Sequence, residues 1–484
     1  MTYTSHREAL EKHLKKYKFD PEWQNWVKTN IAAGCDKNAI FKILLDEGFT
    51  YNQIKEELNF EPAVPLTQLI NPLKEPIPAQ QDTTDTTIKK PDPLFIPNAQ
   101  KLEKQGIEFF LLDDFLNAEE CEKMIALIGL SLRPSGITSR DEPDKYYRTS
   151  RTCDLGLLND PFVEDIDRRI CAIMGIDPAY SEALQGQHYD VGQEFKAHTD
   201  FFEQNEMTEF GGALGQRSYT FMIYLNEVED GGETSFPLIQ QTLKPIRGQA
   251  VIWNNINPDG SPNHKSMHHA HPVNKGSKTV ITKWFRTKNG LPVFAREANE
   301  YIINHTKIGF EKHRLPNALF AKITKFYGDN LGHEVREEVP GDFIQTTSKN
   351  NGKNAVGSVL IELSQPLRDE IHQCLKSELE AWSGIKLRST YVYGIRIYQN
   401  GATLREHRDR IDSHIISAII NVDQHVNEDW PLVIEDNYYR RHDIILKPGD
   451  VVFYEGGRLL HGRPKPLNGI RYANVFCHFK PLEE

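Results

Sequence analysis

The sequence predicts an α+β protein in which two β-sandwich units follow one another along the chain, each with flanking helices, behind a small helical module. Three observations carry this prediction. Short apolar segments with alternating side chains recur from about residue 186 to the end. Helical periodicity is confined to a few stretches. The order of helix and strands over residues 105–290 is repeated over residues 316–484.

Composition places the chain among globular proteins. Its 484 residues are too many for one ordinary domain, and 39% are hydrophobic and 26% charged. No run of about 18 apolar residues predicts a membrane span, and the charged N-terminus does not resemble a secretory signal. A net charge of −11 disfavours a nucleic-acid partner. The six cysteines lack CxxC spacing, which predicts reduced thiols and a cytoplasmic location.

Residues 1–61 have apolar side chains at helical spacing and predict a helical module. It is either a cap or docking piece, or a peptide-binding module that exposes Trp23 or Trp26. Residues 62–104 are rich in proline and threonine, which predicts a semi-extended linker. A proline-rich docking peptide is a second interpretation of this segment.

The unit at 105–290 begins with a helix predicted over 118–132, with Asn117 as its N-cap. Its predicted strands are Tyr219–Leu225, Thr242–Leu243, Ala250–Trp253 and Val280–Phe285. Residues 291–315 predict a connecting helix. The unit at 316–484 has a helix predicted over 366–380. Its strands are predicted at Tyr391–Tyr398, His414–Val422, Leu432–Glu435, Asp443–Leu446, Val451–Tyr454 and Tyr472–Phe479.

The tripeptide His198-Thr-Asp200 is the strongest chemical signal. Residues two apart on a strand point to one face, so His198 and Asp200 would both project into the sandwich. His268 is the candidate for a third ligand, although His269 and His271 lie beside it. Two imidazoles and one carboxylate leave open positions, which suits a non-haem Fe(II) that binds a cosubstrate and O2.

Lys278 follows His268 by ten residues, and Tyr189 precedes His198 by nine. An inward-facing Lys278 requires an anionic partner, such as the distal carboxylate of a cosubstrate, and Tyr189 could donate to the same group. Alternatively, Lys278 is a solvated strand residue and Tyr189 belongs to the core.

These residues carry a resemblance to the prolyl 4-hydroxylase family over about 105–288. The matching segments are Asp114-Phe-Leu116, Arg148-Thr-Ser150, Gln187-His-Tyr189, Gly192–Asp200, Tyr224-Leu-Asn226, Gly231-Gly-Glu-Thr-Ser-Phe-Pro237, Ser266-Met-His268, Pro272-Val273, Gly276-Ser-Lys278 and Lys283-Trp284. The resemblance implies a double-stranded β-helix (jelly-roll) fold. It also implies His198, Asp200 and His268 as iron ligands, with Lys278 and Tyr189 binding 2-oxoglutarate.

The reaction that the resemblance implies consumes 2-oxoglutarate and O2 at Fe(II), with ascorbate as reductant, and hydroxylates proline in a protein or peptide. The presence of Asp200 disfavours the halogenating relatives, in which a small residue leaves that ligand position to a halide. One departure is Phe195, at a position that is often Tyr in the family.

The second unit repeats the spacings of the first. Tyr398 precedes His407 by nine residues, and Arg471 follows His461 by ten. With Asp409, these residues predict a second centre, in which His407, Asp409 and His461 hold iron and Tyr398 and Arg471 bind 2-oxoglutarate. This half also resembles the 2-oxoglutarate/Fe(II) oxygenase superfamily, but it lacks the GGETxFP motif. The alternative is a duplicated sandwich kept as a scaffold or substrate platform.

The leading hypothesis is a cytosolic peptidyl proline hydroxylase with two oxygenase centres. One alternative is a hydroxylase of a free amino acid or small metabolite, and another is one active domain beside a binding platform. Near the second centre, four arginines either receive an acidic peptide or form a solvated face: Arg408, Arg410, Arg440 and Arg441. The sequence does not predict the oligomeric state.

Overall fold

The computed structural model of the chain describes residues 94–135, 147–337, 339–347 and 357–482, together with 51–60 and scattered positions between 19 and 49. The chain divides into two compact units, Met1–Lys89 and Lys90–Glu484. Among the described helices, none is long and apolar enough to cross a membrane.

In the first unit, helix α4 (Tyr51–Leu58) contributes Ile54 and Leu58 to a small apolar cluster. Trp23 is partly buried against this cluster, and its ring lies edge-on to Phe49 at 5.3 Å. Trp23 therefore contributes to packing, whereas Trp26 lies outside the described residues, as do residues 62–93 of the predicted linker.

The second unit begins earlier along the chain than predicted from the sequence. Leu94 and Ile96 are buried in its apolar core, and strand β1 (Gln100–Lys101) pairs with β2 (Phe109–Leu112). Residues 94–104, which were predicted as linker, are therefore part of the folded unit. Alternating apolar side chains are too few here to reveal a two-residue edge strand.

A large and a small sheet form the first half of this unit. The large sheet has the order β1-β2-β11-β7-β14-β5-β4-β3, with β15 paired to β14, and the small sheet has the order β10-β9-β12-β6. The remaining strand bounds are β3 Arg133–Pro134, β4 Arg151–Asp154, β5 Gln185–Tyr189, β6 Phe195–His198, β7 Arg217–Tyr224, β8 Asp230–Gly231, β9 Thr234–Phe236, β10 Gln241–Leu243, β11 Ala250–Asn254, β12 His268–Ala270, β13 Val273–Lys275, β14 Lys278–Lys288 and β15 Leu291–Pro292.

Helices α6 (Ala118–Gly129) and α7 (Pro161–Met174) cover the large sheet. The predicted N-cap is confirmed: Asn117 and Glu120 form a reciprocal capping box at the start of α6. Proline at the first turn of α7 and a left-handed Gly175 after its end define that helix. Met124, Ile128 and Ile170 pack with Ile281 and Phe285 from β14, which leaves the other face of the sheet for the site.

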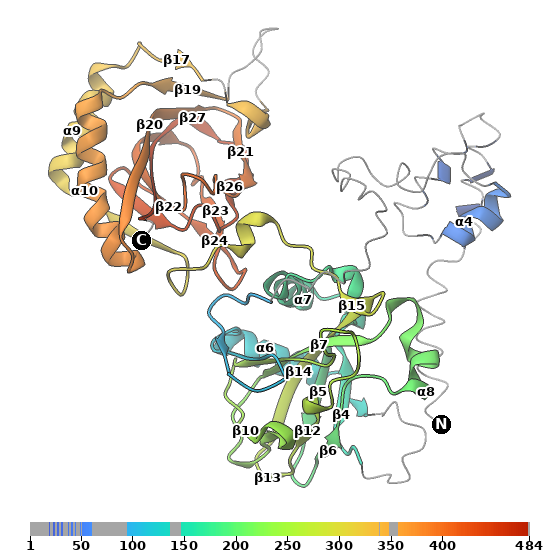
Figure 1. The fold of residues 1–484 in the computed structure, drawn as a ribbon. Helices are drawn as coiled ribbons and strands as arrows, with labels where there is room; N and C mark the ends of the chain where they lie inside the picture. The colour runs from blue at the N-terminus through green and yellow to red at the C-terminus, as the bar shows by residue number, and fades with distance from the viewer. Residues whose placement is uncertain are drawn as a thin grey trace. The chain divides into compact units, whose positions relative to one another are not determined.

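The second half also has two sheets, in the orders β16-β25-β22-β27-β20-β19-β17 and β18-β21-β26-β23-β24. Figure 1 shows helices α9 (Asn317–Asp329) and α10 (Gln365–Ser383) side by side along the large sheet. The strand bounds are β16 Phe310–Arg314, β17 Val335–Arg336, β18 Ile344–Thr346, β19 Ser358–Ile361, β20 Leu387–Gln399, β21 Ala402–His407, β22 Ile416–Val426, β23 Leu432–Glu435, β24 Arg441–Ile444, β25 Asp450–Tyr454, β26 His461–Arg463 and β27 Gly469–Pro481.

The two halves have the same strand order. In chain order, β2, β4, β5, β7, β11 and β14 occupy the places of β16, β19, β20, β22, β25 and β27 in the large sheets. Likewise, β6, β9, β10 and β12 occupy those of β21, β23, β24 and β26 in the small sheets. Positions in the two halves can therefore be compared strand by strand.

The prediction of a connecting helix over 291–315 is wrong. This segment contains β15, a single helical turn at Ala298–Tyr301 and the edge strand β16, so the second half begins at Phe310 rather than at 316. Its polar side chains bind the second half instead of forming helix contacts: Asn299 donates to the carbonyl oxygens of Asp409 and Gly457. Long-range contacts override the weak helical periodicity of this segment.

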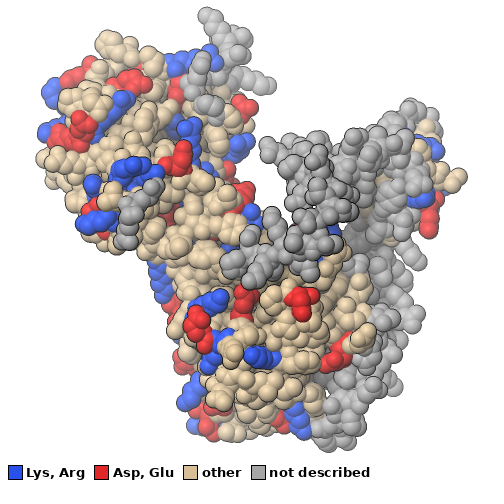
Figure 2. Space-filling model, viewed as in Figure 1, with Lys and Arg blue, Asp and Glu red and all other residues tan. Residues whose placement is uncertain are grey.

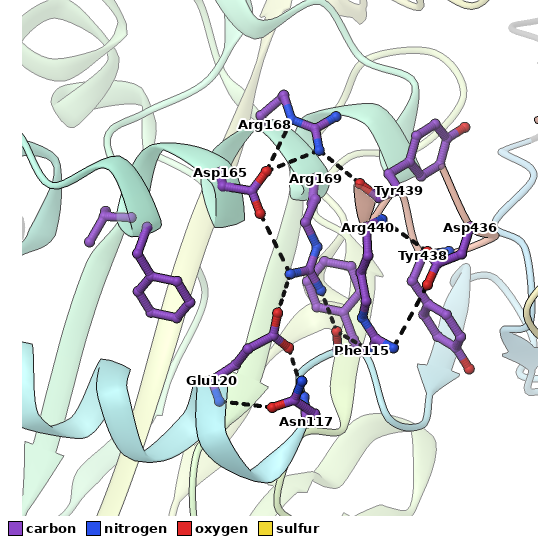
Figure 3. A network of polar contacts seen from close by, with 12 residues as sticks. Phe115, Asn117, Glu120, Asp165, Arg168, Arg169, Asp436, Tyr438, Tyr439 and Arg440 are labelled. Carbon is purple, nitrogen blue, oxygen red and sulfur yellow. Dashed lines mark hydrogen bonds and ion pairs between the residues drawn. The ribbon is translucent and has the colours of Figure 1, made fainter. Parts of the chain in front are cut away.

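Charged hydrogen bonds join the two halves (Figure 3). The carbonyl oxygen of Phe115 accepts from Arg169 at 2.7 Å and from Arg440 of the second half at 2.9 Å. Arg168 of α7 donates to the carbonyl oxygen of Tyr439 at 2.7 Å, and Tyr439 itself is buried in the apolar core of the first half. The halves therefore share a packed interface within the second unit.

Candidate metal centres

Three side chains of the first half that could ligate a metal lie together. His198 ends β6 and His268 begins β12, and the two residues are direct partners in the antiparallel pair. Asp200 lies just beyond the end of β6 rather than on the strand. The ligand atoms of the three residues all lie within 4.8 Å of one another.

The orientation of both imidazole rings is fixed by backbone carbonyl groups. Nδ1 of His198 lies 2.7 Å from the carbonyl oxygen of Lys196, and Nδ1 of His268 lies 2.9 Å from that of Ser266. A carbonyl oxygen only accepts, so Nδ1 carries the proton in each ring and Nε2 keeps its lone pair. Each Nε2 is thus the atom available to a metal.

The Asp200 carboxylate is held by a short relay of hydrogen bonds. Thr220 donates to its Oδ2 at 2.7 Å, and Asn255 donates to Thr220 at 2.8 Å. Burial raises the pKa of Asp200, but the neighbouring His268 and His198, together with Arg217 and Thr220, outweigh burial and hold that pKa below its ordinary value. This relay was not predicted from the sequence, although the inward position of Thr220 on β7 is a usable signal.

Burial, followed by repulsion from His268, lowers the pKa of His198 well below its ordinary value. The neutral imidazole is the form that binds a metal. Aromatic rings surround the pair: Phe195 stacks on His198 at 3.4 Å, and Trp253 meets His268 edge-on at 4.9 Å. Phe195, the departure noted in the sequence, therefore packs on a ligand ring.

The other two histidines of this region lie elsewhere. His269 pairs with Glu194 at 3.0 Å, on the opposite face of β12, and His271 contacts the Ser235 hydroxyl at 2.7 Å. Of the three neighbouring histidines, only His268 shares the cluster with His198 and Asp200 among the described residues. The donor set fits Fe(II), which a two-histidine, one-carboxylate face holds with open positions.

Lys278 is buried, with 1% of its surface exposed. It pairs with Tyr189 across β14 and β5, and its ammonium group lies 5.3 Å from the Tyr189 ring and 5.7 Å from the Tyr224 ring. It donates to Thr234 at 3.2 Å and forms no ion pair with any described carboxylate. Burial lowers its pKa to about 7. An unpaired buried ammonium is costly, so this position is suited to an anionic ligand.

The second half contains an equivalent cluster. His407 ends β21, His461 begins β26, and the two residues are again direct partners. Asp409 lies 3.6 Å from Nε2 of His407 and 3.7 Å from Nε2 of His461. Nδ1 of each ring faces a carbonyl oxygen, that of Arg405 at 2.8 Å and that of Leu459 at 2.9 Å. Tyr454 donates to Asp409 at 3.1 Å.

The two residues expected to bind 2-oxoglutarate in the second half, Tyr398 and Arg471, lie in different environments. Tyr398 is fully buried and packs edge-on against Trp430 at 5.1 Å. Arg471 instead pairs with Asp423 at 2.7 Å, and Asp423 also accepts from Tyr327 of α9. Arg471 therefore lies on the helix-covered face of the sheet. Its predicted role as the 2-oxoglutarate anchor is wrong, because strand alternation turns it away from the cluster.

The four arginines near the second centre do not form a uniform basic surface. Arg408 binds Glu297 and Glu300, Arg440 binds the first half, and Arg441 binds Glu406. On the face drawn in Figure 2, described basic and acidic side chains are interspersed. Of the two interpretations, the acidic-peptide mouth is therefore not supported for Arg408, Arg440 and Arg441.

Comparison with known proteins gives concordant matches. A family model described as the 2OG-Fe(II) oxygenase superfamily matches residues 184–286. "Probable prolyl 4-hydroxylase 8" of Arabidopsis thaliana is 33% identical over 198 residues, which are 36% of this chain and 67% of that protein. "Prolyl 4-hydroxylase 5" of the same plant is 34% identical over 194 residues, which are 36% of this chain and 66% of that protein.

This chain thus spans about two thirds of the length of these plant relatives. Among solved structures, the viral collagen prolyl hydroxylase of Paramecium Bursaria Chlorella virus-1, described as a "2OG complex", is 24% identical. That match has a TM-score of 0.30 and covers 37% of this chain and 96% of the viral chain.

The buried Lys278 makes stability depend on pH. Burial lowers its pKa from 10.5 to about 7, so the cost of burying the charge is fully present below about pH 7. It disappears as the pH rises towards 10.5, because over this interval the unfolded chain binds more protons than the folded chain. We expect Lys278→Met to raise the free energy of unfolding by a few kcal/mol near pH 7, and by much less near pH 10.

Urea unfolding of the metal-free protein measures this difference. The control is Lys283→Met on the same strand, because Lys283 is equally buried but pairs with Asp167 at 2.6 Å. Removing Lys283 should lower stability. A destabilising effect of Lys278→Met near pH 7 would contradict the assignment of an uncompensated charge.

Proposed function

The chain belongs to the prolyl 4-hydroxylase family of 2-oxoglutarate-dependent dioxygenases, and from this premise we propose that its first half hydroxylates prolyl residues in a protein or peptide. One observation carries the proposal: Nε2 of His198, Nε2 of His268 and the Asp200 carboxylate converge, with the unpaired Lys278 buried in the same sheet-to-sheet core. Iron ligands and a cosubstrate anchor are thereby available together.

The residues would divide the work as follows. His198, His268 and Asp200 would hold Fe(II), and Lys278 with Tyr189 would bind the distal carboxylate of 2-oxoglutarate. When bound, the metal and the cosubstrate supply the oxidising chemistry. Thr220 keeps the Asp200 carboxylate in place, and the rings of Phe236 and Trp253 keep water away from His268. The side of the cluster that carries no protein ligand would then receive the substrate.

Ascorbate as reductant and a cytosolic location are part of the same proposal. The described cysteines are free thiols, and Cys121, Cys153, Cys171 and Cys477 are buried, which fits a reducing compartment. A free amino acid or small metabolite is the alternative substrate. Assays with proline-containing peptides and with free proline side by side would separate the two.

We expect His198→Ala to abolish proline hydroxylation by the first half, because the metal loses one of three protein ligands. Mass spectrometry of a proline-containing peptide, with succinate measured in parallel, follows the product. His269→Ala is the matched control, since His269 lies on the same strand as His268 but pairs with Glu194. It should retain most activity. Undiminished hydroxylation in His198→Ala would contradict the proposal.

We further propose that His407, Asp409 and His461 form a second iron centre. The shared strand order, the direct pairing of the two histidines and the orientation of their Nδ1 atoms all support it. Burial lowers the pKa of His461 to about 4, which favours the neutral ligand form. The alternative is a second half that serves only as a binding platform for the substrate.

Iron content distinguishes these alternatives. The wild-type chain, loaded with Fe(II) without oxygen and desalted, should hold two iron ions per chain, whereas His407→Ala and His198→Ala should each hold one. A His425→Ala control should keep both, because His425 lies outside both clusters. A wild-type value of one, unaffected by His407→Ala, would identify the second half as a platform without iron.

A further inference from the structure

A buried arginine, Arg463, lies beside the second cluster, and the sequence predicts no role for it. Arg463 has 1% of its surface exposed. Its Nη1 donates to the carbonyl oxygen of Trp430, and its Nη2 has no hydrogen-bond partner among the described residues. Its guanidinium lies 4.6 Å from the Trp430 ring and 4.5 Å from the Tyr472 ring. Within the part of the chain that the structure describes, it forms no ion pair.

Strand register places Arg463 at a defined position. On β12 and β6, His268 pairs with His198 and Ala270 pairs with Phe195, with one extra residue on β6 between the two pairs. On β26 and β21, His461 pairs with His407 and Arg463 pairs with Leu404, with the same extra residue on β21. Arg463 therefore occupies the position of Ala270, on the same strand face as the histidine ligand.

The position of Lys278 is taken by a different residue in the second half. Lys278 pairs with Tyr189 across β14 and β5, and Tyr472 pairs with Tyr398 across β27 and β20. Tyr472 thus stands where the first half has its buried cation, and it contacts Arg463 directly. The cation lies on β14 in the first half and on β26, the strand of the third candidate ligand, in the second.

A buried guanidinium without a carboxylate partner is costly unless an anion joins it. A second buried donor lies on the inward face of β27. Asn474, two residues beyond Tyr472, is fully buried, and its Nδ2 meets no hydrogen-bond acceptor in the described part of the chain. The neighbouring Ala473 and Val475 point to the other face and pack in the core beneath α9 and α10. Unsatisfied donors therefore gather inside the sandwich.

We propose that Arg463, and not Arg471, binds the distal carboxylate of 2-oxoglutarate in the second half, an inference that rests on the proposed second iron centre. A guanidinium offers two parallel donors to a carboxylate, and the free Nη2 supplies one of them. Arg471 is already neutralised by Asp423 on the opposite face. The first and second halves would thus bind the same group with cations from different strands.

Binding of 2-oxoglutarate tests this without any turnover. The full chain carrying Lys278→Met, which disables the first anchor, is loaded with Mn(II) and titrated by calorimetry. It should bind one equivalent of 2-oxoglutarate at the second half. Adding Arg463→Met should weaken this binding roughly 10- to 100-fold, the value of a charge-assisted hydrogen bond. Adding Arg471→Met, the matched control, should leave the affinity unchanged.

A variant with a rebuilt site separates loss of the carboxylate anchor from misfolding. Arg463→Ala combined with Tyr472→Lys recreates the Ala270 and Lys278 arrangement and should restore binding relative to Arg463→Met. Unchanged affinity in Arg463→Met with the second Mn(II) retained, or a loss in Arg471→Met instead, would overturn the inference alone. A chain that holds one Mn(II) irrespective of His407→Ala would overturn the second centre as well.

Discussion

The direct pairing of two histidines across neighbouring strands is the constraint on which both candidate centres depend. His198 faces His268, and His407 faces His461, at the ends of strands in the small sheets. This pairing brings the two imidazoles together before any metal binds, and a backbone carbonyl fixes the Nδ1 proton of each ring. The aspartate then needs only to lie two residues beyond the first histidine. The rest of each sandwich holds these two strands in register.

Both halves bury a positively charged side chain in their cores. Lys278 lies in the first core without a carboxylate partner among the residues that the structure describes, and its lowered pKa reflects the cost of that burial. The nearby Lys283 shows the usual solution, an ion pair with Asp167. A protein retains an uncompensated cation in its core where a ligand supplies the missing anion. Arg463 is a comparable buried cation in the second half, although the two cations lie on different strands.

Much of this structure follows from the sequence, because alternation and helical periodicity report burial directly. The N-cap at Asn117, the longest strands (β7, β14, β20, β22 and β27) and the co-location of His198, Asp200 and His268 could all be predicted. Arg471 could not. Lys278 follows His268 by ten residues, but the equivalent Tyr472 follows His461 by eleven. A spacing of ten therefore selects Arg471, and one residue of difference turns a strand side chain to the opposite face. Only the register reveals it.

Anomalous diffraction at the iron absorption edge tests the central claim most directly. Crystals grown without oxygen in the presence of Fe(II) should give one peak bounded by Nε2 of His198, Nε2 of His268 and the Asp200 carboxylate. A second peak should lie among His407, Asp409 and His461. Absence of the first peak at full iron loading, or a peak at His269 or His271 instead, would contradict the ligand assignment and with it the proposed chemistry.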